Sequence, residues 1–186
     1  MKLGLTGPIA SGKGEVTKIL ISKGFLFISL SDIVREEAKR RNIELSRENL
    51  QNLGNSLRRE FGPGILGKIV RERIEVESQK NWVIDGIRNP YEVYELRKMK
   101  DFYLIAVTAP IEILIERVIS RRRAEDPESV DEIKEKILRE IGDDQPEEGQ
   151  RIKDCIAISD FTIVNIHSLS HLEEEVDKII RTLSAL

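Results

Sequence analysis

The chain has too few cysteines and histidines for several common kinds of site. Among its 186 residues are one cysteine, Cys155, and two histidines, His167 and His171. A single cysteine excludes an internal disulfide framework and most zinc sites. Two histidines leave little material for a Ser-His triad or a multi-histidine metal centre. Chemistry in this protein must therefore depend on other residue types.

Long hydrophobic stretches and an excess of positive charge are also missing. The longest apolar run is Phe102 to Val107, much shorter than the roughly 20 residues that span a bilayer. The start of the chain does not resemble a signal peptide. Lys and Arg number 30 against 33 Asp and Glu, a net charge of −3, so the whole protein is no electrostatic partner for nucleic acid. We expect a cytoplasmic protein that binds neither membrane nor nucleic acid.

Strand and helix patterns alternate, which predicts an α/β fold with a mainly parallel sheet. Short apolar segments mark five candidate strands, and helix starts are indicated by Asn89 with Glu92, Ser129 with Glu132 and Ser170 with Glu173. Residues 46–80 hold successive helices without a strand, so we expect one domain: a core of about 1–45 and 81–186 with a helical insert. The strands are Lys2 to Thr6, Phe25 to Ile28, Trp82 to Ile84, Phe102 to Val107 and Phe161 to Val164.

The sharpest motif is GPIASGKG, which fits G-x-x-x-x-G-K between a predicted strand and a predicted helix. Loop N–H groups and the positive end of a helix bind polyphosphates. Gly7 and Gly12 allow close backbone approach, and Lys13 neutralises phosphate charge. We predict that the phosphates of ATP are held by residues 7–15: Gly7, Pro8, Ile9, Ala10, Ser11, Gly12, Lys13, Gly14 and Glu15.

Two positions after the lysine depart from the common motif. Gly14 replaces the Ser or Thr that usually ligates Mg²⁺, which resembles the GKGT of adenylate kinases, but Glu15 then replaces the Thr. The GKGE version is similar to a group of archaeal adenylate-kinase-related proteins. A carboxylate beside phosphates repels them unless a cation lies between, so Glu15 is a candidate ligand of Mg²⁺.

A second acidic motif, VIDG, places Asp85 at the end of a predicted strand, where it can hold Mg²⁺ through water. Motor ATPases usually have a water-activating Glu at the position of Gly86. The chain also lacks the N-K-x-D guanine signature and LSGGQ. This pattern favours phosphoryl transfer over hydrolysis, with a simple turn residue as the alternative for Asp85.

Two segments resemble nucleotide kinases. ISLSDIVR, which ends at Arg35, is similar to ISTGDMLR of nucleoside-monophosphate kinases; this implies that Arg35 binds the acceptor phosphate and that Asp32 serves metal or proton. Alternatively, Asp32 and Arg35 simply pair on one helix face. VIDGIRNPYEVYELR resembles a stretch of phage-type deoxynucleotide kinases, and Arg88 would face the ligand crevice and bind phosphate. A salt bridge to Glu92 is the alternative for Arg88.

Basic residues gather where a helix ends, in ERVISRRRAEDP. Related kinases carry an arginine-rich lid here, at about 117–130, which implies that Arg117 and Arg121 close over the transferring phosphate. Charge runs are more often solvated and also complement a helix dipole. In the helical insert, Arg58, Arg59 and Lys68 offer further cations, and we expect at least two of them to face solvent.

GLTGPIASGKG and SDFTIVN also resemble dephospho-CoA kinases, which would place Asn165 near adenine; we favour an exposed turn there. Together these resemblances imply a P-loop NTPase fold with a five-stranded parallel sheet in the order 2-3-1-4-5. They imply ATP and Mg²⁺ as cofactors and a nucleoside or deoxynucleoside monophosphate as the small-molecule acceptor. Two alternatives stay open: phosphorylation of a ribose hydroxyl, as in dephospho-CoA kinases, and a nucleotide-binding regulator with little turnover.

Overall fold

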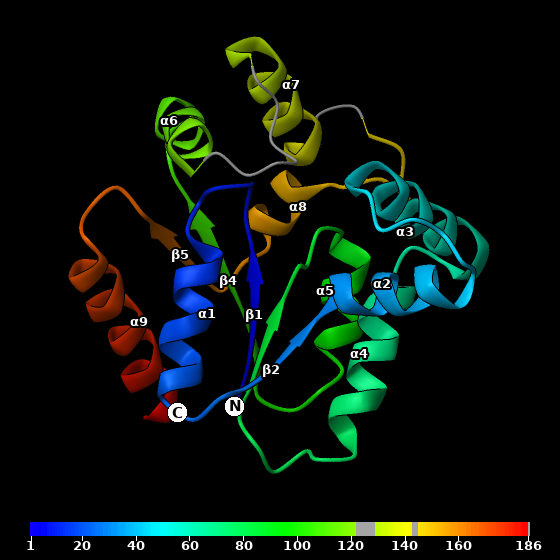
Figure 1. Ribbon diagram of the computed structural model, residues 1–186. Helices are drawn as coiled ribbons and strands as arrows, with labels where there is room; N and C mark the ends of the chain where they lie inside the picture. Colours follow the sequence, from blue (N-terminus) through cyan, green and yellow to red (C-terminus); the bar gives the residue numbers. More distant parts are fainter. Residues whose placement is uncertain (122–128, 143–144, 186) are drawn as a thin grey trace.

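The computed structural model describes residues 1–121, 129–142 and 145–185. In this part of the chain, five parallel strands form one sheet in the order β2-β3-β1-β4-β5, as predicted (Figure 1). The strands begin and end within about one residue of the segments read from the sequence. They are β1 (Lys2–Thr6), β2 (Leu26–Ser29), β3 (Trp82–Asp85), β4 (Phe102–Thr108) and β5 (Phe161–Val164).

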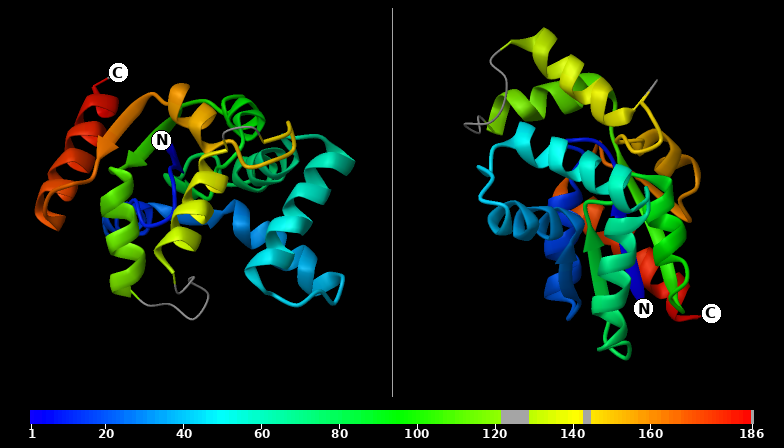
Figure 2. Two further views of the ribbon diagram at one scale, coloured as in Figure 1. Left: turned by 90° about the horizontal axis from the view of Figure 1, so that it is seen from above. Right: turned by 90° about the vertical axis from the view of Figure 1, so that its right-hand side faces the viewer.

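Helices cover both faces of the sheet (Figures 1 and 2). Because parallel strands are buried on both sides, their alternate residues enter two cores. Val83 and Ile105 pack with α1 (Lys13–Ser22) and α9 (Leu169–Ser184), whereas Ile84 and Leu104 enter the other core. That second core is formed with α2 (Leu30–Arg40), α3 (Arg47–Phe61), α4 (Ile65–Glu75), α5 (Pro90–Leu96) and α8 (Ile152–Ala157).

A third, smaller cluster lies above the carboxyl ends of the strands. Here α6 (Ile111–Arg121) and α7 (Val130–Ile141) pack against each other and against Ile9 of the glycine-rich loop. The loop is therefore in contact with this helix pair as well as with the sheet. None of the described helices is both long and apolar enough to cross a bilayer.

Most predicted local features are confirmed, one is wrong, and one short helix was missed. The capping boxes at Asn89 and Ser129 are present, and the insert contains helices without a strand among its described residues. Helix α9, however, begins after Ser168, whose Oγ accepts the N–H of His171 at 3.3 Å, and not at Ser170. Helix α8 was not predicted, because six residues are too few to show a helical period.

Candidate functional site

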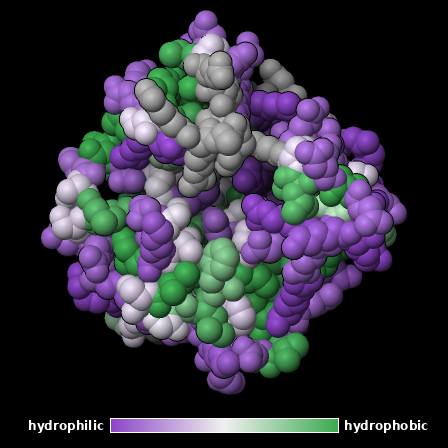
Figure 3. Space-filling view, viewed as in Figure 1, coloured by the Kyte–Doolittle hydropathy of each residue, from purple (hydrophilic) through white to green (hydrophobic). Residues whose placement is uncertain are grey.

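A cleft of about 1310 Å³ opens at the carboxyl ends of the strands, the edge at which open parallel sheets bind ligands. The glycine-rich loop, α2, α3 and the α6–α7 pair contribute to its walls. In the space-filling view the cleft appears as a hollow with hydrophilic residues at its rim (Figure 3). Its volume exceeds the roughly 300–1,000 Å³ of a typical single-ligand pocket.

The loop between β1 and α1 requires its glycines. Gly7 has a backbone φ of +138° and Gly12 has a backbone φ of +106°. Residues other than glycine rarely adopt these values. A Cβ on Gly7 would lie 2.0 Å from the carbonyl oxygen of Val107, and one on Gly12 would lie 2.2 Å from Nδ2 of Asn165. The two glycines predicted from the motif are thus fixed by close packing as well as by conformation.

Lys13 opens α1 and turns its ammonium group into the loop. Its Nζ donates hydrogen bonds to the carbonyl oxygens of Gly7 at 2.6 Å and Pro8 at 2.8 Å. Desolvation lowers the pKa of Lys13 to about 8, although the nearby carboxylate of Asp85 opposes this shift. An incoming phosphate would meet a preplaced cation at the mouth of the loop.

The two candidate metal ligands differ in their surroundings. Asp85 ends β3, and its Oδ1 is buried without a hydrogen-bond partner among the described residues. Buried polar atoms normally have partners, so an orphaned carboxylate oxygen beside a phosphate site fits a hydrated Mg²⁺. Glu15 instead accepts a hydrogen bond from Lys18 at 2.8 Å on the half-exposed side of α1, so its carboxylate does not plug the loop.

Asp32 and Arg35 both line the cleft, in the first turns of α2. Arg35 Nη1 lies 2.8 Å from Asp32 Oδ1, and both side chains are about half-exposed. The pairing on one helix face is therefore present, and it leaves Arg35 accessible to a ligand.

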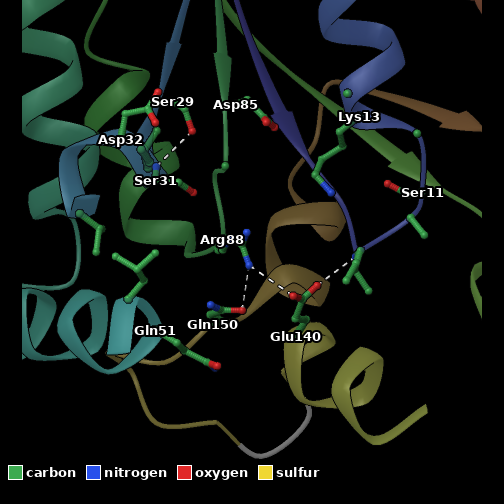
Figure 4. A pocket seen from close by; sticks show the side chains of 18 of the residues that line it. Ser11, Lys13, Ser29, Ser31, Asp32, Gln51, Asp85, Arg88, Glu140 and Gln150 are labelled. Carbon is green, nitrogen blue, oxygen red and sulfur yellow. Dashed lines mark hydrogen bonds and ion pairs between the residues drawn. The ribbon is translucent and has the colours of Figure 1, made fainter. Parts of the chain in front are cut away.

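Arg88 lies in the middle of the cleft (Figure 4). Its Nη1 is 3.3 Å from Gln150 Oε1 and 3.5 Å from Glu140 Oε1. The alternative, a salt bridge from Arg88 to Glu92, is wrong. Glu92 Oε2 accepts the main-chain N–H groups of Arg88 and Asn89 at 2.9 and 3.1 Å, because Glu92 caps the start of α5.

The other oxygen of Glu92 binds an arginine of the insert. Arg58 of α3 donates to Glu92 Oε1 from Nε at 2.9 Å and from Nη2 at 2.8 Å, and the two side chains are 4% and 0% exposed. Arg59 and Lys68 are exposed, so the expectation that at least two of these three cations face solvent is confirmed. The buried pair joins the insert to the core beside Arg88.

Arg117 and Asn165 brace the glycine-rich loop from its other side. Arg117 donates to the carbonyl oxygens of Asn165 at 2.9 Å and Ala10 at 3.4 Å, and Asn165 Nδ2 donates to the carbonyl oxygen of Ser11 at 2.9 Å. The predicted exposed turn at Asn165 is wrong, because this residue is half-buried against the loop. Arg121 lines the cleft, and residues 122–128 of the predicted lid lie outside the described residues.

Two residues of the cleft were missed at the sequence level. Gln150 lies in an irregular segment before α8, where no pattern marks it. Glu140 is a different case, because Ile133, Ile137 and Glu140 follow the helical period of α7 and are all buried. The sequence signal for Glu140 was a charged residue at a position of the helix that the apolar period predicts to be buried.

Comparisons with known proteins agree with this geometry. A family model described as an AAA domain matches residues 6–134. A UPF0200 protein of Pyrococcus abyssi is 32% identical over 184 residues, covering 96% of this chain and 95% of the relative. A UPF0200 protein of Methanocaldococcus jannaschii is 31% identical, with 97% and 89% covered.

Solved structures show the same fold. TT1252 from Thermus thermophilus matches with a TM-score of 0.59 and 20% identity, over 98% of this chain and 97% of the other. Shikimate kinase from Aquifex aeolicus matches with a TM-score of 0.51 and 17% identity, over 100% and 97%. At such identities the likeness concerns the P-loop fold alone.

Proposed function

Because this chain belongs to the UPF0200 family and, through its AAA domain, to the P-loop kinase-like proteins, we propose that it transfers the γ-phosphoryl group of ATP to a nucleotide-like acceptor. We further propose a nucleoside or deoxynucleoside monophosphate as that acceptor. Membership supports nucleotide binding and phosphoryl transfer in general, and the acceptor is argued from the cleft.

One observation carries the proposal: a single cleft contains both a phosphate loop and a second set of cations. Lys13 lies on the loop side, Arg35 lies in α2 on the opposite side, and Arg88 lies between them in the middle of the cleft (Figure 4). An arginine fork suits a phosphate, so the second set offers a place for the phosphate of an acceptor. The cleft is also larger than a typical single-ligand pocket.

Residues of the donor half would act mainly through position and charge. Residues 7–14 would surround the ATP phosphates with main-chain N–H groups, and Lys13 would neutralise their charge. Mg²⁺, when bound, supplies further neutralisation of phosphate charge, and Asp85 is the residue best placed to hold it, with Glu15 as a second candidate. Arg117 and Arg121 would complete the cationic wall around the transferring group.

Transfer is favoured over hydrolysis by the residue that follows Asp85. Gly86 has no side chain to activate a water molecule, and its φ of +82° suits glycine. A Cβ there would lie 3.2 Å from Ser31 Oγ and 3.3 Å from Ser29 Oγ. The position is therefore closed to the glutamate that motor ATPases use.

An acceptor screen with ATP and Mg²⁺ tests the proposal. We expect ADP release to depend on a nucleoside or deoxynucleoside monophosphate and a phosphorylated product to appear. Activity only with dephospho-CoA would favour transfer to a ribose hydroxyl. Tight ATP binding without turnover on any acceptor would contradict an enzymatic function and favour a regulatory one.

A further inference from the structure

Glu140 is a buried carboxylate that contacts both halves of the cleft. It lies in the last turn of α7 and is 5% exposed. Its Oε2 accepts the main-chain N–H of Ile9, in the glycine-rich loop, at 3.0 Å. Its Oε1 lies 3.5 Å from Nη1 of Arg88 (Figure 4). Burial of a carboxylate costs free energy unless its oxygens have partners, and here the two oxygens serve two different sites.

Ile9 is held by α7 in two ways, through the hydrogen bond from its N–H to Glu140 and through the packing of its side chain. The side chain of Ile9 is 8% exposed and packs in the cluster formed by α6 and α7. Helix α7 thus holds Ile9 through apolar packing and through a charge-assisted hydrogen bond to its N–H. The position of the loop is set by the helix pair that follows β4.

Arg88 is fixed at its main chain but less firmly at its guanidinium group. Its N–H is capped by Glu92, and its carbonyl oxygen accepts the N–H of Arg151 at 2.7 Å. The guanidinium group makes longer contacts, to Gln150 at 3.3 Å and to Glu140 at 3.5 Å. Contacts of this length orient an arginine while leaving it ready to exchange one partner for another.

We propose that Glu140 is a positioning residue that fixes the phosphate loop and Arg88 relative to each other, and that the phosphate of the acceptor replaces its carboxylate on Arg88. This inference rests on the proposed function, in which Arg88 binds that phosphate. The carboxylate is an internal anion that orients Arg88 whenever no acceptor is bound. A phosphate carries more charge and more acceptor oxygens than a carboxylate, so it competes well for the same fork.

The test compares two substitutions of Glu140 with a matched control. Glu140→Gln keeps an oxygen that can accept the Ile9 N–H but removes the charge beside Arg88, whereas Glu140→Ala removes both contacts. Glu135→Gln is the control, because Glu135 is an exposed residue of the same helix. Melting temperatures show which variants are folded. If E140A does not fold, E140Q alone tests the contact between Glu140 and Arg88.

Hydrogen exchange of the Ile9 amide, followed by NMR in the ligand-free protein, measures the strength of the hydrogen bond from Ile9 to Glu140. Loss of a buried hydrogen bond should speed this exchange about tenfold in E140A and less than about threefold in E140Q. The control E135Q should leave it unchanged. A wild-type exchange rate in E140A would overturn the proposal.

Calorimetric titration of inorganic phosphate into ADP-saturated protein measures phosphate affinity, and thus how strongly the Glu140 carboxylate competes with phosphate for Arg88. Removing the competing charge should tighten phosphate binding about three- to tenfold in E140Q, and the gain should disappear in an Arg88→Ala background. Unchanged phosphate binding in E140Q, or a gain that persists without Arg88, would refute the proposal. Failure of ADP to bind the wild-type protein would instead reject the proposed function, and the exchange of the Ile9 amide would still test Glu140.

Discussion

The two halves of the cleft are built in different ways. On the proposed donor side, the contacts of Lys13 run to its neighbours in the sequence, Gly7 and Pro8, and distant residues such as Asn165 brace the loop from outside. On the acceptor side, the contacts join residues far apart in the chain, as from Arg58 to Glu92 and from Arg88 to Gln150. The loop can thus be recognised in a short run of residues although distant residues brace it, whereas the proposed acceptor side has no such run and depends on contacts across the completed fold.

The largest effect should follow from breaking the acceptor side at Glu92. Glu92→Ala leaves Arg58 buried without its carboxylate partner and removes the Glu92 half of the capping box of α5, so we expect a loss of about 3–5 kcal/mol in the free energy of unfolding. Urea denaturation measures it. Glu75→Ala, which removes an exposed pair with Arg71, should cost less than about 0.5 kcal/mol. Equal losses in the two variants would show that the buried pair does not hold the insert.

The donor side should fail in catalysis rather than in folding. Lys13→Ala removes one preorganised charge and should reduce turnover on the order of 10²- to 10³-fold. Steady-state assays with the acceptor found in the screen measure this, and Lys39→Ala is the control, since Lys39 is exposed near the end of α2. Near-normal turnover in Lys13→Ala would contradict the role of Lys13.

Arg35 allows the two halves to be separated by kinetics. Because charged hydrogen bonds contribute about 1.5–3 kcal/mol, Arg35→Ala should raise the KM for the acceptor about 10- to 100-fold and change ATP affinity less than about twofold. Arg40→Ala, at the exposed end of α2, should change neither. Weaker ATP binding with an unchanged acceptor KM would reverse the assignment of the two sides.

The smallest effect is the pH dependence of donor binding. Phosphate favours the charged form of Lys13, whose pKa is about 8, so ATP affinity should fall about tenfold from pH 7 to pH 9. In the ligand-free protein the sign is opposite. Between pH 8 and 10.5 the unfolded chain binds more protons, so the free energy of unfolding should rise with pH through Lys13.

Calorimetry across this range tests the assignment to Lys13. Lys13→Arg keeps its charge at every pH of the experiment, so any ATP binding that this variant retains should be independent of pH. An equal decline in both proteins would assign the pH dependence to another group.

The same contrast explains what the sequence could predict. The motif GPIASGKG was enough to predict the glycine-rich loop, because its turns need residues with positive φ and glycine is the residue that adopts such angles readily. The sheet order came from family resemblance, and the strand limits came from apolar runs. Ser170 with Glu173 matched a capping pattern, yet Ser168 begins α9, because two serines in the same short stretch offer equivalent local caps.

The acceptor side could be predicted only in part. Arg35 and Arg88, which both line the cleft, were picked out because their segments resemble those of nucleotide kinases. The partners of Arg88 were not found, because Glu140 and Gln150 approach it from 52 and 62 residues away. These contacts depend on how the fold places α7 and the segment before α8 beside Arg88. No local sequence pattern indicates that tertiary placement.

The central place of β1 in the sheet has a consequence for synthesis on the ribosome. This strand is made first, but its neighbours are β3 and β4, whose residues begin at Trp82 and Phe102. A nascent chain must therefore carry an apolar, unpaired strand until β3 has been made, and β1 gains its second neighbour only when β4 follows. The glycine-rich loop, braced by Asn165, takes its final form later still, so nucleotide can stabilise the protein only after β5 has been made.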